Sequence, residues 1–195
     1  MAKLYFKYGS MGSSKTVQAL ITKHNYENAG KKVLLLKSAT DTRDGANIIR
    51  SRLGLEAEAY PIQKDSEVFL LVDTIRPDVI ICDEAQFFSP GVVDALHHVA
   101  AFDDIPVLCF GLLTDFQTHL FTGSKRLIET AESIKEIQMI CNCGKKSTVN
   151  ARIIDGKIVT KGDQIFIGGD ESYQAMCYEC FRRKLTQQEE EEECQ

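Results

Sequence analysis

The sequence predicts an α/β fold in which a mainly parallel sheet is flanked by helices and followed by a small second lobe. Over residues 1–140, apolar strand-like runs alternate with helical patterns, an order typical of parallel sheets. A loop rich in glycine and serine and closed by Lys15 and Thr16 separates the first strand from the first helix. Four cysteines in two close pairs lie near the C-terminus and indicate the second lobe.

Composition and charge narrow the class of protein. The 195 residues are 44% apolar, enough for one core and a smaller appendage, and the formal net charge of −5 argues against a general nucleic-acid binder. Residues 1–8 offer no signal-peptide core, and no apolar run approaches the roughly 20 residues of a membrane span. We therefore expect a globular cytoplasmic protein with no nucleic-acid or membrane partner. Residues 187–195, which include five glutamates, are expected to form a disordered acidic tail.

The first strand, loop and helix form a phosphate-binding pattern. Residues 2–8 alternate and are rich in aromatics, as in a strand, and residues 16–29 carry the apolar stripe of a helix. The loop between them resembles a P-loop and consists of Gly9, Ser10, Met11, Gly12, Ser13, Ser14, Lys15 and Thr16. Its backbone N–H groups and Lys15 are expected to bind the phosphates of ATP, and the Thr16 hydroxyl to coordinate Mg²⁺.

Ser14 departs from the usual P-loop pattern, G-x-x-x-x-G-K-[ST], which has glycine at this position. Glycine lets the backbone approach a phosphate with no side chain between them. Two outcomes stay open: Ser14 is tolerated, or it weakens ATP binding. A flexible turn before a helix is the alternative interpretation of the loop, and Lys15 followed by Thr16 disfavours it.

The next two segments extend the alternation of strand and helix. Residues 32–37 are predicted to form a buried strand, which leads into a polar loop with Asp41 and Arg43. In open α/β sheets ligands gather beyond the carboxyl ends of the strands, so this loop is placed where function is expected. Residues 66–75 have a helical pattern with Ser66 as the expected N-cap.

A third strand ends in two acidic residues. The apolar run 78–84 finishes with Asp83 and Glu84, which resembles a Walker B segment. Asp83 would hold Mg²⁺ opposite Thr16, because a carboxylate is a hard oxygen ligand of the kind that Mg²⁺ prefers. Glu84 would lie near the terminal phosphate. The alternative is that the two acids only begin a turn.

The remaining segments complete the predicted sheet. They are a helix over 90–102, a strand over 105–111, a loop over 112–121, a helix over 125–131 and a strand over 134–140. Five strands alternating with helices are the form expected of a P-loop NTPase core of the RecA-like type.

The chain changes character at Cys141. Cys141 and Cys143 form one close pair, Cys177 and Cys180 form another, and short strands and glycine-rich turns lie between them. Four thiolates at this spacing predict a structural Zn²⁺ that holds together a lobe too small for a core of its own. Four cysteine ligands leave no open position for a catalytic zinc. We therefore divide the chain into an ATP-binding domain (1–140), a zinc-binding domain (141–186) and the tail.

The motifs occur together in an order that resembles the cytosolic-type (type II) thymidine kinases, over about residues 4–185. They are Met11 in the P-loop, Asp41-x-Arg43, Asp83-Glu84-Ala85-Gln86-Phe87, Phe116 and Phe121, and the cysteine pairs flanking Ile167-Gly168-Gly169-Asp170-Glu171-Ser172-Tyr173. The resemblance implies transfer of the ATP γ-phosphate to the 5′-hydroxyl of thymidine, giving dTMP and ADP in pyrimidine salvage for DNA synthesis. It also implies a zinc-held lasso that closes over the nucleoside, and a homotetramer.

The resemblance further implies roles for individual residues. Glu84 would be the general base for the 5′-hydroxyl. Asp83, Glu84, Ala85 and Gln86 would complete the ATP site begun by the P-loop. The thymidine site would consist of Met11, Asp41, Arg43, Leu112, Phe116, Phe121, Ile167, Gly168, Gly169 and Tyr173. For the aromatic members of this set, ordinary packing is the alternative.

Two other functions stay open from the sequence. Asp-Glu-Ala-Gln after an apolar strand also occurs in helicases, but a helicase-like ATPase needs two core lobes and a basic track for the nucleic acid. The second alternative is a nucleotide-binding protein whose catalysis is weakened by Ser14. RNA-stimulated ATP hydrolysis would favour the first alternative, and ATP binding without phosphoryl transfer would favour the second.

Overall fold

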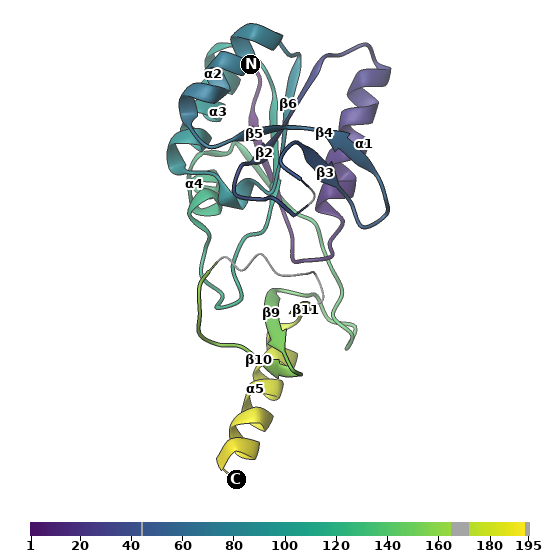
Figure 1. Cartoon of the computed structure of the whole chain (residues 1–195), viewed down its shortest axis with the longest axis vertical. Helices are drawn as coiled ribbons and strands as arrows, with labels where there is room; N and C mark the ends of the chain where they lie inside the picture. Colours follow the sequence, from purple (N-terminus) through teal and green to yellow (C-terminus); the bar gives the residue numbers. More distant parts are fainter. Residues whose placement is uncertain (44, 165–171, 194–195) are drawn as a thin grey trace.

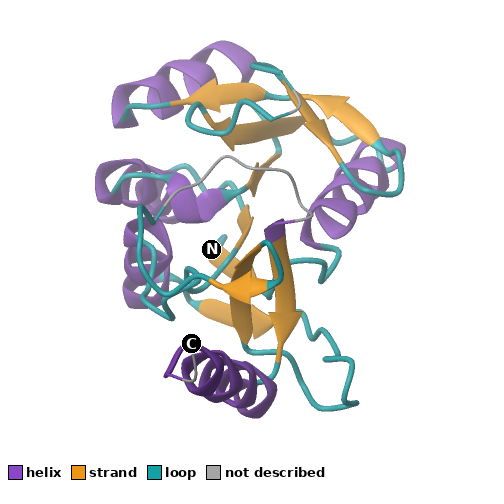
Figure 2. Cartoon of the chain, turned by 60° about the horizontal axis from the view of Figure 1, so that its bottom comes forward, coloured by secondary structure: helices purple, strands orange, loops and turns teal. Residues whose placement is uncertain are grey.

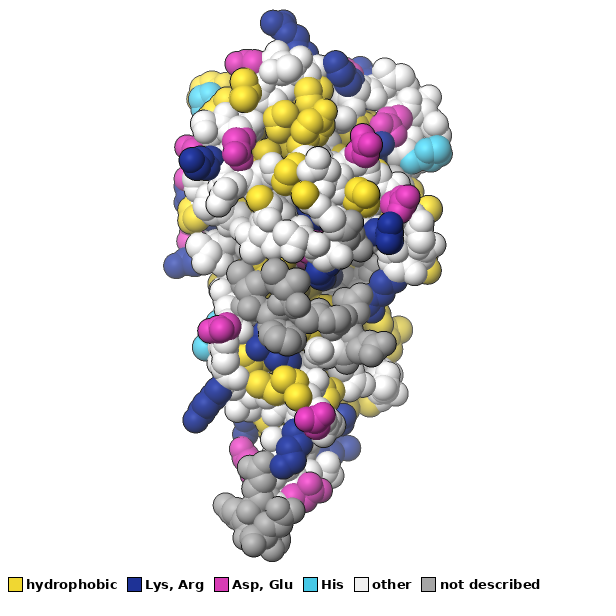
Figure 3. Space-filling view, in the orientation of Figure 1, with side chains coloured by type: hydrophobic (Ala, Val, Ile, Leu, Met, Phe, Trp, Pro, Cys, Tyr) yellow, Lys and Arg dark blue, Asp and Glu magenta, His cyan; other side chains and the backbone are white. Residues whose placement is uncertain are grey.

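A computed structural model of the chain contains a helix-flanked sheet with a smaller lobe below it (Figure 1). The structure describes residues 1–43, 45–164 and 172–193. Within these residues no helix is both long and apolar enough to cross a bilayer. On the face seen in Figure 3, acidic and basic side chains are interspersed over the upper part of the molecule.

The main sheet has six strands, and every pair of neighbours in it is parallel. In spatial order they are β5 (Tyr60–Ile62), β2 (Val33–Ser38), β6 (Val79–Asp83), β7 (Val107–Gly111), β1 (Leu4–Tyr8) and β8 (Ser133–Glu136). Because parallel strands end at the same edge of a sheet, the loops after β1, β2, β6 and β7 meet there. These are the loops that carry the predicted P-loop, Asp41, Glu84 and Leu112.

Helices cover both faces of the sheet (Figure 1). The helix α1 (Lys15–Asn28) lies on one face, and α2 (Asp65–Ile75), α3 (Pro90–Phe102) and α4 (Thr122–Thr130) lie on the other. Successive residues of one strand therefore enter different cores: Leu34 and Leu36 pack on the side of α2 and α3, and Leu35 packs with Leu20 of α1. Burial on both faces explains why the central strands are continuous apolar runs and confirms the predicted fold class.

Several element boundaries differ from the sequence prediction: α4 begins at Thr122 rather than at residue 125, and β7 begins at Val107 rather than at residue 105. The strand expected over 134–140 ends at Glu136, where its pairing with β1 stops. Helix α2 begins at Asp65, so Ser66 is not its N-cap. The Glu67 carboxylate instead accepts hydrogen bonds from the backbone N–H groups of the two residues before the helix, at 2.7 and 2.9 Å.

Three short strands were not predicted. The edge strand β5 contains Pro61, which has no N–H to donate and lowers any strand prediction. The hairpin of β3 (Ile48–Arg50) and β4 (Glu56–Glu58) consists of two three-residue strands, which are too short to establish the apolar alternation that marks a half-buried strand.

The small lobe has a three-stranded antiparallel sheet and one helix, which lie together in Figure 2. Its elements are β9 (Val149–Ile154), β10 (Lys157–Ile158), β11 (Tyr173–Met176) and α5 (Tyr178–Glu193). Val149, Ala151, Met176 and Phe181 form a small separate core with the buried cysteines. The lobe therefore has apolar packing of its own in addition to the cysteine cluster.

The prediction of a disordered tail from residue 187 is wrong for residues 187–193, which continue α5. The side chain of Gln188 fixes this part of the helix to β10, since it accepts from the Ile158 N–H at 2.9 Å and donates to the Ile158 carbonyl at 3.3 Å. These hydrogen bonds between Gln188 and β10 stabilise the helix where it enters the glutamate-rich segment.

We predict that Gly123→Ala destabilises the protein by about 1–3 kcal/mol, the usual cost of overpacking. A Cβ atom on Gly123 would lie 2.7, 2.7 and 2.8 Å from three backbone carbonyl oxygens of the segment after β6, so α4 would have to move. Gly91→Ala in α3 is the matched control, because its nearest neighbours would be 3.9 Å away. Urea unfolding of both variants checks the prediction, and equal stabilities would contradict it.

Candidate active site

A pocket of about 770 Å³ lies at the edge where the strands end, within the size range of ligand sites. The residues predicted for a site that line this pocket are Met11, Gly12, Ser14, Lys15, Thr16, Asp41, Arg43, Asp83, Glu84, Gln86, Leu112, Phe116, Phe121 and Tyr173. Ile167, Gly168 and Gly169 lie outside the described residues. The sheet topology thus brings together side chains from four loops and from β11.

The predicted P-loop runs into the start of α1. Lys15 is buried, and its Nζ donates to the Ser10 carbonyl at 2.8 Å. Burial lowers the pKa of Lys15, although the nearby carboxylates of Glu84 and Asp83 act in the opposite direction. An anion in the pocket would favour the charged lysine. This donor set, with the Thr16 hydroxyl beside it, fits a polyphosphate.

Ser14 adopts the left-handed conformation, with φ of 62°. This conformation costs an L-residue about 1–2 kcal/mol and explains why glycine is usual at this position of a P-loop. The Ser14 side chain is exposed at the pocket wall. Gly9 is required for a different reason, because a Cβ atom there would lie 2.5 Å from the Ile137 carbonyl oxygen.

Asp83 ends β6 and is fully buried beside Thr16, which hydrogen-bonds to its carboxylate. Burial, followed by the negative charge of Glu84, raises the pKa of Asp83 to about 7. A carboxylate and a hydroxyl oxygen side by side are hard ligands, so Asp83 and Thr16 together fit Mg²⁺.

This pKa predicts how stability depends on pH in magnesium-free protein. The folded state keeps the Asp83 proton up to about pH 7, whereas an unfolded aspartate releases it near pH 4. Asp83 therefore contributes stability at low pH that is lost as the pH rises from about 4 to 7. We predict that Asp83→Asn stabilises the protein by up to about 4 kcal/mol at pH 8 and hardly at all at pH 4. Denaturant unfolding at both pH values checks this, and an equal effect at the two would contradict it.

Arg43 joins the loop after β2 to the end of β6. Its Nε donates to Asp41 at 2.7 Å, and its Nη2 donates to Asp41 at 3.2 Å and to Glu84 at 2.6 Å. Burial alone would raise the pKa of Asp41, but the hydrogen bond and charge of Arg43 outweigh it and lower that pKa. Asp41 therefore stays ionised and orients the arginine.

Glu84 receives a hydrogen bond on each carboxylate oxygen. Oε1 accepts from Arg43, and Oε2 accepts from the amide of Gln86. Gln86 is itself buried, and its Oε1 accepts from the Leu112 N–H at 3.0 Å. The orientation of the carboxylate is thus fixed by two other loops of the site.

Part of the pocket wall is aromatic. Phe116 and Phe121 are buried and line the pocket, and Phe87 packs edge-on against Phe121 with ring centroids 5.6 Å apart. Tyr173 reaches the same pocket from β11. A ligand whose flat ring is apolar on both faces and polar at one edge would fit against aromatic walls of this kind.

Several pocket residues were missed by the sequence analysis. Arg50 to Leu53 reach the pocket from the β3–β4 hairpin, Lys37 from within β2, Gln164 from the small lobe and Asn150 from β9. Lys37 is buried and donates to the carbonyls of Gly45 and Ile48 at 3.1 and 2.9 Å. A lysine inside an apolar strand was the one signal in the sequence that could have identified it.

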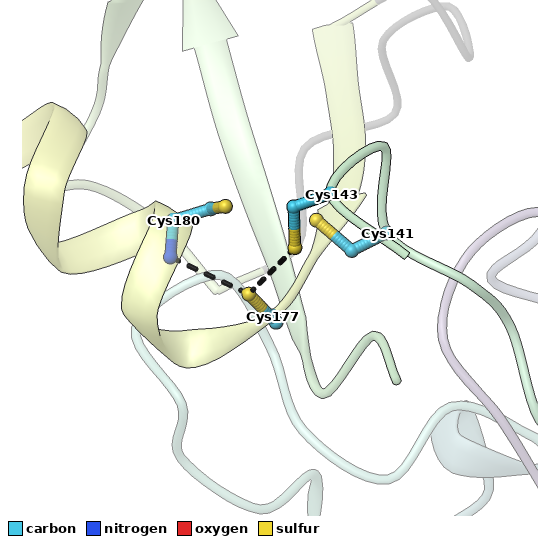
Figure 4. Close-up of side chains that lie close together, drawn as sticks. All are labelled: Cys141, Cys143, Cys177 and Cys180. Atoms are coloured by element: carbon cyan, nitrogen blue, oxygen red, sulfur yellow. Dashed lines mark hydrogen bonds between the residues drawn. The ribbon is translucent and has the colours of Figure 1, made fainter. Parts of the chain in front are cut away.

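The four cysteines face one another in the small lobe (Figure 4). All four Sγ atoms lie within 4.8 Å of one another, and sulfurs around a tetrahedral zinc are about 3.8 Å apart, given a Zn–S bond of about 2.3 Å. Backbone N–H groups of Cys143 and Cys177 lower the pKa of Cys141 to about 6, which favours the thiolate that binds metals. The one-residue gap between Cys141 and Cys143 lies in a turn that ends at Gly144, with φ of 85°. The group fits a zinc ion.

Comparisons with known proteins show the family to which the chain is similar. A family model described as thymidine kinase matches residues 2–181. A thymidine kinase of Streptococcus pyogenes serotype M3 is 47% identical over 180 residues, which are 91% of this chain and 95% of that one. A thymidine kinase of Streptococcus agalactiae serotype Ia is 46% identical with the same coverage. A crystal structure of a DNA replication initiation factor is only distantly similar, with a TM-score of 0.42 and 16% identity over 70% of this chain and 40% of that one. By the family model and these relatives, the chain belongs to the thymidine kinase family.

Proposed function

We propose that this protein is an ATP-dependent thymidine kinase, which transfers the γ-phosphate of ATP to the 5′-hydroxyl of thymidine and releases dTMP and ADP. One observation carries the proposal: a phosphate-binding loop, an oriented glutamate and an aromatic wall line a single pocket. The family and the named relatives support the choice of nucleoside.

At the ATP end, Lys15 and the backbone of the P-loop bind the phosphates. Thr16 and Asp83 would hold Mg²⁺, which when bound neutralises charge on the transferring phosphoryl group. The low exposure of Lys15 and Asp83 strengthens their electrostatic effect, because water is excluded from around them.

At the transfer step, Glu84 accepts the proton of the 5′-hydroxyl. Arg43 and Gln86 each donate to one of its oxygens, so the carboxylate is held in one orientation before substrate arrives. A carboxylate is a weak base for an alcohol, but in a loose transition state the proton leaves late and positioning dominates the rate. Arg43 also places a positive charge beside the transferring phosphate.

At the nucleoside end, Met11, Leu112, Phe116 and Phe121 enclose the thymine ring, and Tyr173 closes the wall from the small lobe. The roles assigned to Ile167, Gly168 and Gly169 stay predictions outside the described residues. Cytosine would be rejected because an unpaired buried donor or acceptor costs about 1–3 kcal/mol.

The four cysteines bind one structural Zn²⁺ in this proposal, and the division into an ATP-binding domain (1–140) and a zinc-binding domain (141–186) belongs to it. A homotetramer and a cytoplasmic location are further parts of the proposal that rest on family resemblance. Light scattering of the purified protein measures the number of subunits directly.

A phosphoryl-transfer assay tests the function. ATP and Mg²⁺ are supplied with each of the four natural deoxynucleosides and with deoxyuridine, and ADP and nucleoside monophosphate are followed together. We expect ADP formation to depend on thymidine and to match dTMP mole for mole. ATP binding with no phosphorylated nucleoside would contradict the proposal. It would favour the alternative of a nucleotide-binding protein whose catalysis is weakened by Ser14.

A further inference from the structure

Two polar side chains of β9 point to the same side of the strand, because Asn150 and Arg152 are two residues apart. Each is only 4% exposed, which is unusual for an arginine. Buried polar groups are retained where their hydrogen bonds are satisfied, so the contacts of these two residues indicate what they do.

Asn150 joins the small lobe to two loops of the main sheet. Its Oδ1 accepts from the backbone N–H of Met11 at 2.8 Å, and its Nδ2 donates to the Thr114 carbonyl at 3.0 Å. Met11 belongs to the P-loop, and Thr114 follows β7 on the way to the aromatic wall. A single amide therefore fixes the P-loop backbone from outside the sheet that carries it.

Arg152 makes the corresponding contacts at the nucleoside end. Its guanidinium lies 3.8 Å from the ring centroid of Phe116. Its Nε and Nη2 donate to the Tyr173 hydroxyl at 3.0 and 2.7 Å, and Nη2 also donates to the Asp163 carbonyl at 3.1 Å. Phe116 and Tyr173 both line the pocket, so Arg152 fixes two of its walls relative to each other.

We propose that Asn150 and Arg152 are positioning residues with different targets: Asn150 sets the P-loop, which binds ATP and also carries Met11 to the thymine ring, and Arg152 sets the aromatic wall for the nucleoside alone. The nucleoside half rests on the proposed thymidine kinase activity. The ATP half requires only that the P-loop binds ATP. The strand β9 then connects the small lobe to both substrate sites.

Because Asn150 and Arg152 have different targets, their substitutions should change the KM values for ATP and thymidine differently. Loss of the Asn150 amide frees the Met11 N–H and the Thr114 carbonyl, and loss of a hydrogen-bonded anchor corresponds to a change of about tenfold in a binding constant. Asn150→Ala should raise the KM for ATP about tenfold and also raise the KM for thymidine, because Met11 lines the thymine site as well. Arg152→Met should raise the KM for thymidine about tenfold and change the KM for ATP less than threefold.

The experiment measures both KM values and kcat for wild type, Asn150→Ala and Arg152→Met, with melting temperature and zinc content for each. Matched controls are Asn28→Ala and Arg183→Met, which remove an exposed asparagine from α1 and an exposed arginine from α5. Both controls should keep wild-type constants. Arg152→Lys should behave like Arg152→Met. The lysine ammonium group is not planar, so it cannot both stack on the Phe116 ring and donate two hydrogen bonds to the Tyr173 hydroxyl as the guanidinium group does.

Several results would overturn the proposal: unchanged KM values in both variants, an unchanged KM for ATP in Asn150→Ala, equal rises of both constants in Arg152→Met, or full recovery by Arg152→Lys. If the larger changes prevent folding, Asn150→Ser and Tyr173→Phe replace them. Tyr173→Phe removes only the hydroxyl that Arg152 binds, so it should raise the KM for thymidine severalfold and be non-additive with Arg152→Lys. An unchanged KM for thymidine in Tyr173→Phe would refute the Arg152 half.

Calorimetric ATP binding without nucleoside separates this proposal from the proposed function. If wild type binds ATP but phosphorylates no nucleoside, the thymidine kinase assignment fails, and a weaker ATP affinity of Asn150→Ala still supports the Asn150 half. Equal ATP affinities of wild type and Asn150→Ala would refute that half even if thymidine is phosphorylated.

Discussion

Glu84→Gln should lower kcat for thymidine phosphorylation by about 10²–10⁴-fold, the range in which general bases contribute. Glutamine has the same shape but cannot accept the proton of the 5′-hydroxyl. Its oxygen can still accept from Arg43, but its NH₂ group faces the NH₂ group of Gln86, so the hydrogen bond between these two side chains is lost. Lys15 and the P-loop backbone are not changed by the substitution, and we therefore expect the ATP affinity to stay within about threefold, a change of less than 1 kcal/mol.

The measurement is a steady-state assay combined with calorimetric ATP binding. Glu129→Gln is the control, since Glu129 is exposed on α4 and forms a surface ion pair with Arg126. Its kcat should equal that of wild type. Wild-type turnover in Glu84→Gln would remove Glu84 from the proton-transfer step, and a large loss of ATP affinity would make its role one of binding.

Cys177→Ser should abolish zinc binding and unfold the small lobe. The Cys177 Sγ lies 3.5 Å from that of Cys143 and accepts from the Cys180 N–H at 3.4 Å, so it is central to the cluster (Figure 4). Structural zinc supplies about 10–16 kcal/mol of apparent binding energy, far more than a small apolar core can replace. Thymidine phosphorylation should fall by at least about 100-fold, the loss expected when about 2.7 kcal/mol or more of transition-state stabilisation disappears with the Tyr173 wall.

The main sheet should survive this change. Its two apolar cores are built from residues up to Leu127, with Ala131 and Ile137 packed at their margins. Elemental analysis should find about one zinc per chain in wild type and in Cys109→Ala, which removes a buried thiol from β7, and none in Cys177→Ser. Limited proteolysis should cut the variant after residue 140. A full zinc content in Cys177→Ser would exclude Cys177 as a ligand.

The parts of the fold that the sequence predicted are those decided by local pattern. The runs 79–83 and 107–111 are buried on both faces, so their composition alone distinguishes them from surface segments. The edge strand β5 gains its structure from β2, which is distant in sequence, and its own residues carry little signal. The β3–β4 hairpin is local, but each of its strands is only three residues long, too short to show a pattern. Like β5, the helical end of α5 depends on a contact distant in sequence, between Gln188 and β10.

The candidate site shows the same division. Lys15, Asp83 and the cysteines follow spacings that chemistry imposes, and could be identified in the sequence. Asn150 and Arg152 stand alone in a strand with no motif around them, and only the packing of β9 against the pocket loops gives them partners. The contact of Arg43 with Glu84 joins residues 41 positions apart, and no spacing rule predicts it.

The position of β1 in the sheet has a consequence for biosynthesis. β1 is translated before the other strands of the main sheet, yet it lies between β7 and β8, which are translated more than 100 residues later. The nascent chain therefore holds an apolar strand without a partner until Gly111 has emerged, and without its second partner until Glu136 has emerged. Such delayed pairing slows folding and exposes strand edges to other chains. Arrested chains ending before Val107 should consequently recruit chaperones more strongly than chains released after Glu136.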